Sequence, residues 1–92
     1  MKFERYIYLM VRDGLIIFNS VHKVMSAEKY LKSCGVNAKV MPVPRQLSSD
    51  CGLALVFPLD ELEVTRTVLA EPEYAEHSLY ALEAGGEYRL MR

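Results

Sequence analysis

Two short stretches of the chain are apolar at every position, and both predict strands that are buried on two faces. They are Leu15–Phe18 and Leu53–Phe57. A strand that buries one face alternates in polarity, whereas a continuous apolar run bounded by turn residues is typical of a strand inside a sheet. We therefore expect the two runs to lie side by side in the interior of one sheet.

A helical pattern follows the first of these strands. Asn19-Ser20 offers an N-cap, and Gly35 supplies a left-handed stop at the other end. Apolar residues recur between them at helical spacing: Val21, Val24, Met25, Ala27, Leu31 and Cys34. The pattern predicts a helix over residues 21–34 whose apolar stripe, including Cys34, faces the core.

The next strand is expected at a sheet edge. Residues 38–42 contain Lys39 and Pro42, and proline cannot donate a hydrogen bond to a sheet ladder. A strand with both residues is therefore predicted to have a neighbour on one side only.

The C-terminal half predicts a second helix and a hairpin. Asp60 and Glu63 form an acidic capping box for a helix that ends near residue 71. Residues 78–82 predict a fourth strand, and the pattern leaves a helix over residues 74–82 open. The turn at residues 84–86 predicts a short hairpin that returns the chain through Tyr88, Leu90 and Met91.

The order of these elements predicts an α+β fold, a ferredoxin-like βαββαβ sandwich with an antiparallel sheet. Right-handed crossovers place both helices on one face. Leu15 and Ile17 point opposite to Ile16 and Phe18, so both faces are apolar and the face without helices needs a cover. Two covers remain open. Residues 3–11 would add an N-terminal strand through a turn at Arg12-Asp13-Gly14, or a second subunit would pack there as a homodimer.

Length and charge restrict the classes of protein that need to be considered. With 92 residues, 51% of them hydrophobic, the chain supports a single domain, residues 1–92, divided into an N-terminal extension (1–13) and a core (14–92). A net charge of −1 argues against nucleic acid binding. The apolar run before Arg12 is too short to span a membrane and lacks a signal-peptide cleavage site.

The cysteines and histidines form no recognised framework. Cys34 and Cys51 lack the spacing of a disulfide scaffold, so we expect a reducing cytoplasm. His22 and His77 do not complete a metal-ligand pattern, and no metal is predicted. Basic residues prevail in the first half of the chain and acidic ones in the second, which suits either an oriented partner or an ordinary solvated surface.

One segment concentrates polar chemistry between the second and third predicted strands. It is Pro42-Val43-Pro44-Arg45-Gln46-Leu47-Ser48-Ser49-Asp50-Cys51-Gly52. Pro42 and Pro44 hold the backbone extended, and Gly52 permits backbone angles that other residues resist. We expect Cys51 at the rim of the sheet. Arg45, Ser48 and Ser49 would favour its thiolate and Asp50 would oppose it, and the residues alone leave open which prevails.

The pattern Pro-x-Pro-Arg-x-Leu-Ser-Ser-x-Cys-Gly, followed by an apolar strand, resembles the selenium/sulfur carrier protein-like family of small bacterial domains. The resemblance extends over residues 14–71 through Phe18, Ser20, Ala27, Glu28, Leu31 and the helix end Cys34-Gly35-Val36. It implies a cytoplasmic carrier that holds sulfur or selenium on Cys51 as a persulfide-type adduct. Its partners would be donor and acceptor proteins, and its chemistry needs no cofactor.

A second interpretation uses the same loop without covalent chemistry. The protein would then be a ferredoxin-like binding or regulatory module that recognises an anion or a protein partner through Arg45, Ser48 and Ser49. A third makes Cys51 a small buried residue that begins a strand. Under the first interpretation the protein is a covalent carrier rather than a stand-alone enzyme, because its partners would carry out the bond-making. Hydrolytic catalysis is not favoured, because neither histidine lies in the motif to act as a base.

Overall fold

The computed structural model describes residues 13–47 and 51–91, which form one antiparallel sheet and two α-helices. In chain order the elements are β1 (Asp13–Phe18), α2 (Val21–Ser33), β2 (Lys39–Pro42), β3 (Leu53–Pro58), α3 (Leu62–Leu69), β4 (His77–Leu82) and β5 (Tyr88–Leu90). Short 3₁₀ turns at Leu59–Glu61 and Pro72–Tyr74 flank α3. The predicted α+β class is confirmed.

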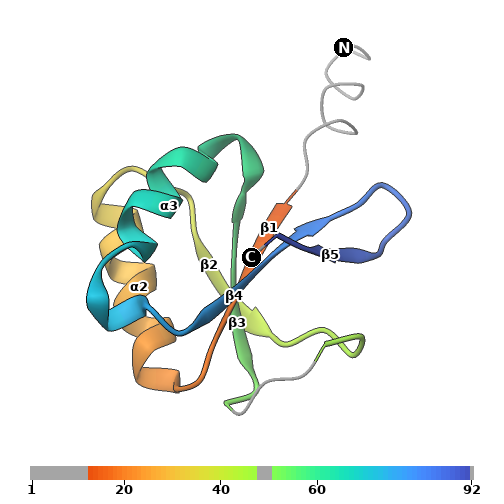
Figure 1. The fold of residues 1–92 in the computed structure, drawn as a ribbon, viewed down its shortest axis with the longest axis horizontal. Coiled ribbons are helices and arrows are strands. Elements are labelled where there is room, and N and C mark those ends of the chain that lie inside the picture. Colours follow the sequence, from red (N-terminus) through yellow and green to blue (C-terminus); the bar gives the residue numbers. More distant parts are fainter. Residues whose placement is uncertain (1–12, 48–50, 92) are drawn as a thin grey trace.

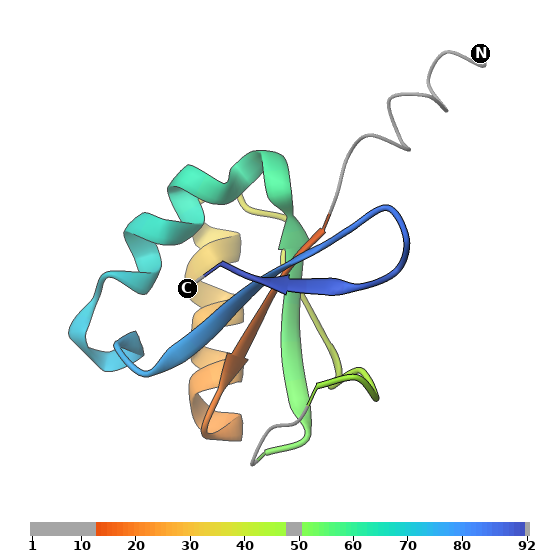
Figure 2. The same ribbon diagram turned by 45° about the vertical axis from the view of Figure 1, so that its right-hand side comes forward.

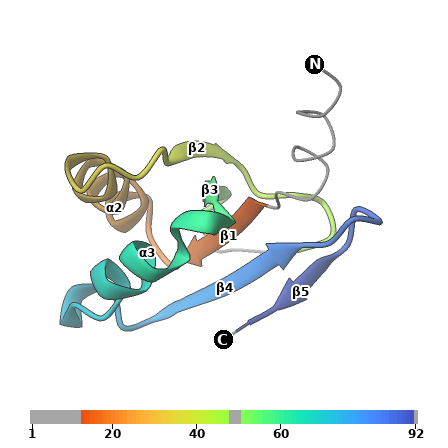
Figure 3. The same ribbon diagram turned by 90° about the horizontal axis from the view of Figure 1, so that it is seen from above.

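The strand order is β2-β3-β1-β4-β5, and every neighbouring pair is antiparallel. Both helices lie on one face of the sheet (Figure 1), and Figure 3 shows α3 from above, drawn over β1 and β3. As predicted, β1 and β3 are neighbours in the interior and β2 is an edge strand. Because β5 lies beyond β4, the strand order differs from that of a four-stranded ferredoxin-like sheet.

The start of β1 differs from the sequence prediction. Asp13 and Gly14 do not form a turn but belong to β1, where Gly14 pairs with Phe57 of β3. A Cβ atom added at Gly14 would lie 2.5 Å from Cε1 and 2.8 Å from Cε2 of the Phe57 ring. Glycine is thus required here by close packing, not by a turn. The predicted strand over residues 3–11 lies outside the described residues.

Helix α2 begins where predicted and ends one residue early. The Ser20 side chain accepts a hydrogen bond of 3.1 Å from the Lys23 amide, and Gly35 adopts a φ of +87°. Val24, Ala27 and Leu31 form its buried stripe. Cys34 is the C-cap and is exposed, so its predicted burial is wrong. The reason is that the chain leaves the helix at Cys34, beyond the last turn that packs on the sheet.

The C-terminal half confirms the predicted strand and hairpin but not the predicted cap. The capping box is wrong, because a 3₁₀ turn precedes α3 and the N-cap Glu61 makes no side-chain capping bond. Residues 77–82 form β4 and not a helix. The hairpin to β5 pairs Leu82 with Tyr88.

The two faces of the sheet have separate apolar clusters. On the helix face, Ile16 and Phe18 pack with residues of α2 and α3. On the other face, Leu15, Ile17 and Ala54 are buried. Among the described residues, their partly buried cover consists of Met41, Val43, Leu47, Val56, Tyr80 and Tyr88. The Pro42–Gly52 segment therefore supplies part of the cover that this face was predicted to need, and the homodimer stays a prediction.

Tyr74 lies in the segment between α3 and β4, and its side chain contacts α2. Its side chain is 1% exposed, its ring centroid lies 5.6 Å from that of Phe18, and its hydroxyl oxygen lies 2.7 Å from the Ser26 hydroxyl oxygen. His77 is half-buried, and its Nδ1 lies 2.6 Å from the carbonyl oxygen of Tyr74. Tyr74 is thus a packing residue whose hydroxyl group needs a hydrogen-bond partner.

Tyr74→Phe is expected to change how stability depends on pH. Burial raises the pKa of Tyr74 above the ordinary value of 10.0. The raised pKa means that the contribution of neutral Tyr74 to the free energy of unfolding is complete below the unfolded-state pKa. This contribution is lost as the pH rises through the higher folded-state pKa. Urea unfolding near neutral pH should show the variant to be less stable than the wild type by about 1 kcal/mol. Above pH 10, the free energy of unfolding should fall less in the variant than in the wild type. An equal fall in both proteins would contradict this.

Candidate functional site

The Pro42–Gly52 segment leaves β2 and enters β3 through a loop closed at its base. The Val43 amide donates to the Gly52 carbonyl at 3.1 Å. The Leu47 amide donates to the Pro44 carbonyl at 3.0 Å, which forms a turn with Arg45 in its middle. The first bond joins the two ends of the loop to each other, and the second lies within the loop.

Side chains also attach this segment to the rest of the fold. Gln46 Nε2 donates to the carbonyl of Gly86 in the β4–β5 hairpin at 3.5 Å, and Leu47 packs on the second face of the sheet. Gly52 has a φ of +77°, as its place in the motif predicted, and a residue with a side chain would be strained there. The loop thus has a defined path on both sides of its undescribed part.

Cys51 lies at the rim of the sheet where β1 ends and α2 begins. Its Sγ donates to the carbonyl oxygens of Leu53 at 3.5 Å and Phe18 at 3.9 Å. The residue is partly buried and packs against the helix-face cluster. Figure 2 shows the start of α2 and the start of β3 at this same end of the molecule. Both carbonyls are acceptors, so these contacts use the proton of the sulfhydryl.

The other predicted site residues have different outcomes. Ser48, Ser49 and Asp50 lie outside the described residues. Arg45 is exposed and makes no hydrogen bond or ion pair with the part of the chain that is described, so its contact with the thiol stays a prediction. Within residues 13–47 and 51–91, no group of three His, Cys, Asp or Glu residues could hold a metal ion.

The two cysteines lie at opposite ends of α2. Sγ of Cys51 contacts Phe18, just before the helix, and Cys34 is its C-cap. A helix of 13 residues is about 20 Å long. The Cα atoms of a disulfide lie within about 7 Å of each other. This fold therefore does not allow a bridge between Cys34 and Cys51.

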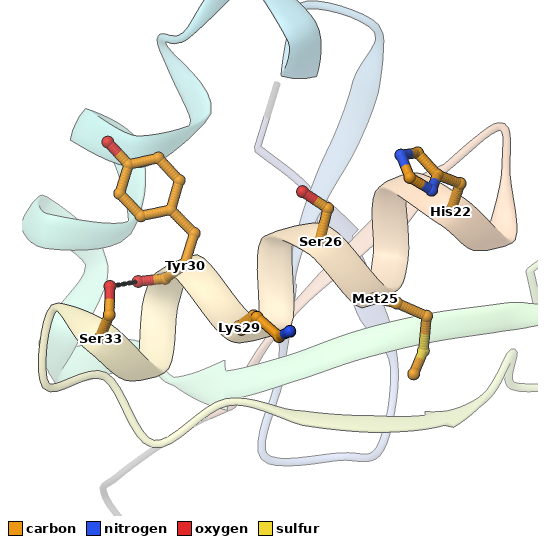
Figure 4. Close-up of a pocket in the computed structure, with 6 residues that line it drawn as sticks. All are labelled: His22, Met25, Ser26, Lys29, Tyr30 and Ser33. Atoms are coloured by element: carbon orange, nitrogen blue, oxygen red, sulfur yellow. Dashed lines mark hydrogen bonds between the residues drawn. The ribbon is translucent and has the colours of Figure 1, made fainter.

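The outer surface of α2 was missed by the sequence analysis. Val21 and Met25 were assigned to the buried stripe, but their side chains are 46% and 48% exposed, so that assignment is wrong. A shallow depression of about 700 Å³ follows the same helix. It is lined by His22, Met25, Ser26, Lys29, Tyr30 and Ser33 (Figure 4).

This depression lacks the geometry of a small-molecule site. Its lining comes from one convex helix, and Figure 4 shows Met25 pointing to the opposite side from Ser26 and Tyr30. Small-molecule sites place several polar groups so that they converge on one volume. The sequence held one indication of this exposed surface. Val21 and Met25 make the apolar stripe of the helix wider than the buried stripe of Val24, Ala27 and Leu31.

A protein-family model matches most of the chain. The family model described as Putative Se/S carrier protein-like matches residues 13–81. The chain belongs to this family. The match begins at β1, includes the whole Pro42–Gly52 segment, and ends in β4.

The Se/S carrier-like family is thus the family that the Pro42–Gly52 motif predicted. No curated protein and no solved structure matches the chain. Among the described residues there is no helix with the length and apolar character needed to cross a bilayer.

Proposed function

We propose that the protein carries sulfur or selenium on Cys51 and transfers it between a donor and an acceptor protein. The observation that carries this proposal is the position of Cys51, partly buried at the rim of the sheet within the motif that the family model covers. A thiol at a rim can be reached by a partner, whereas one in the middle of β3 could not. Arg45, Ser48, Ser49, Asp50 and Gly52 are the proposed loop residues around it, framed by Pro42 and Pro44.

Cys51 would receive sulfur by exchange between its thiolate and a persulfide of the donor protein. Cys51, as thiolate, attacks the outer sulfur of a persulfide on the donor, R–S–SH. A bond forms between Sγ and that sulfur, the S–S bond of the donor breaks, and the electron pair leaves with the donor thiolate. The proton of Cys51 goes to solvent before the attack. Selenium would be transferred in the same way, and no cofactor enters the exchange.

Loading requires the sulfur of Cys51 to change its surroundings. The carbonyls of Phe18 and Leu53 accept a hydrogen bond from the thiol but would repel a thiolate. The side chain must therefore turn away from them when a donor binds. Arg45, in the exposed turn of the same loop, is the cation that we propose then steadies the anion.

A second candidate function is favoured by the same two carbonyl contacts. A thiol that donates to backbone carbonyls and packs on the core resembles a structural cysteine. The loop would then bind an anion or a partner without covalent chemistry. We propose further that the protein acts in the cytoplasm and that its described sheet is a ferredoxin-like sheet extended by β5.

The proposal is tested by intact-mass analysis after incubation with a cysteine desulfurase and cysteine. The mass of the protein should increase by one sulfur atom and return to its original value after reduction. A protein that stays unmodified, under conditions that load an established carrier, would contradict the proposal for sulfur. The same analysis with selenocysteine in place of cysteine, so that the desulfurase carries R–S–SeH, tests selenium.

A further inference from the structure

We propose that β5 pairs, edge to edge and antiparallel, with β5 of a second copy of the chain. The proposal is independent of the carrier function of Cys51. It also differs from the predicted homodimer, because the second copy would lie beside the sheet and not on its helix-free face. β5 is the outermost strand of the described sheet on the side of β4 (Figure 3).

The outer edge of β5 presents backbone groups that no described strand pairs. The Met91 amide donates to the Leu79 carbonyl at 2.7 Å, so residue 91 directs its backbone groups toward β4. Glu87 does the same at the other end of β5, where its carbonyl accepts a bond of 2.7 Å. These groups alternate in direction along an antiparallel strand, so the amides and carbonyls of Tyr88 and Leu90 point away from β4.

The two edges of the sheet are not equally protected against a further strand. β2, the other edge, carries Lys39 and Pro42, and both residue types are typical of edges that avoid pairing. β5 has neither. Its Leu90 side chain is 59% exposed and lies opposite Tyr80, which packs on the helix-free face. The edge of β5 is therefore open and apolar on one face.

The charges on the other face of β5 indicate what the second strand must carry. Glu87 lies opposite Glu83 in the hairpin, so its nearest neighbour on that side has the same charge. Glu83 forms an ion pair with Arg89. Among the residues that the structure describes, the side chain of Glu87 has no hydrogen bond or ion pair. A strand that places a cation opposite Glu87 would be stabilised by that pair.

A second copy of β5 supplies this cation when the two Tyr88 residues pair across a twofold axis. They then exchange two backbone hydrogen bonds, and Glu87 of each copy lies opposite Arg89 of the other. Each Arg89 would keep its contact with Glu83 and gain a second carboxylate. Pairing Tyr88 with Leu90 would instead place the two Arg89 side chains opposite each other, which is unfavourable. The charges thus favour a second copy in the first register.

Other cations near the hairpin lie outside this row of charges. Arg66 of α3 lines a depression with His77, where β4 begins, whereas Glu83 follows the end of β4. Arg45 lies near the hairpin through its neighbour Gln46, which donates to Gly86, but this loop packs on the helix-free face. Neither arginine therefore replaces Arg89 as the group opposite Glu87.

The test measures the oligomeric state of the full chain by sedimentation velocity at several protein concentrations. The wild type should associate to a dimer. Glu87→Arg and Arg89→Glu should each weaken the dimer about tenfold, because each replaces two favourable cross-strand pairs by two repulsive ones. An equimolar mixture of the two variants should dimerise again, since one copy then carries two cations and the other two carboxylates at these positions. Recovery in the mixture also excludes a folding defect.

Glu63→Arg and Arg66→Glu, on the exposed face of α3, are the matched controls for net charge. Each should dimerise as the wild type does. A wild type that stays monomeric would overturn the proposal, and so would β5 variants that dimerise alone as tightly as the wild type. A mixture that stays monomeric would show that Glu87 and Arg89 do not face each other. If the α3 variants weaken the dimer equally, the effect is one of net charge and β5 is not the interface.

Discussion

Cys51→Ser is expected to abolish sulfur loading completely, because the hydroxyl of serine cannot form a persulfide. The fold should survive the change, since serine is similar in size to cysteine and position 51 is only partly buried. Intact-mass analysis after incubation with desulfurase and cysteine gives the result directly, and circular dichroism checks the fold.

Cys34→Ser is the matched control for this prediction. Cys34 is exposed at the C-terminal end of α2, away from the motif, so its replacement should leave loading unchanged. A loaded Cys51→Ser protein would place the sulfur on Cys34 and contradict the assignment. If Cys51→Ser abolishes loading but leaves the binding of a partner intact, the covalent and non-covalent uses of the loop are separated.

Gly14→Ala is expected to be the most destabilising small substitution in β1. The new Cβ would overlap the Phe57 ring, which is 1% exposed and surrounded by the helix-face core. Overpacking of this kind costs about 1–3 kcal/mol. Denaturant unfolding should show this loss, and Gly85→Ala, where an added Cβ meets no atom within 4 Å, should change stability little.

A second substitution tests whether the Phe57 ring is the cause. Phe57→Leu removes the ring atoms that the new Cβ would meet. Gly14→Ala should therefore cost less in the Phe57→Leu protein than in the wild type, and the coupling between the two sites should exceed about 0.5 kcal/mol. Additive effects would show that the glycine is required for some other reason.

The sequence predicted those parts of the fold that depend on local patterns. The apolar runs at residues 15–18 and 53–57 identified the two interior strands, and Pro42 identified the edge strand correctly. Ser20 and Gly35 marked the ends of α2 to within a residue. Each of these signals is a property of the backbone or of one element, which explains why it can be recognised without tertiary contacts.

The errors arise where a distant residue decides the outcome. Gly14 was interpreted as a turn residue because its reason, the Phe57 ring on a neighbouring strand, is 43 positions away in the sequence. Val21 and Met25 repeat at helical spacing, yet they lie beside the stripe of Val24, Ala27 and Leu31 that packs on the sheet, and they are exposed. The capping box failed because a 3₁₀ turn leads into α3.

The candidate site was predictable as a location but not as a geometry. The motif placed Cys51 at the start of an interior strand, and the family comparison agrees with the motif. The carbonyls that accept hydrogen bonds from its thiol belong to Phe18 and Leu53. Because every residue has a backbone carbonyl, the sequence does not indicate which ones act as acceptors. The exposed outer surface of α2 could be recognised only when the sheet was in place.

Native-state alkylation of the Cys34→Ser protein, which keeps one thiol, decides whether a visiting molecule can reach Cys51 in the folded state. We expect iodoacetamide to modify Cys51 in the folded protein, more slowly than in the unfolded chain because the thiol is partly buried. Modification that occurs only after denaturation would contradict it and would make Cys51 an ordinary residue of the core.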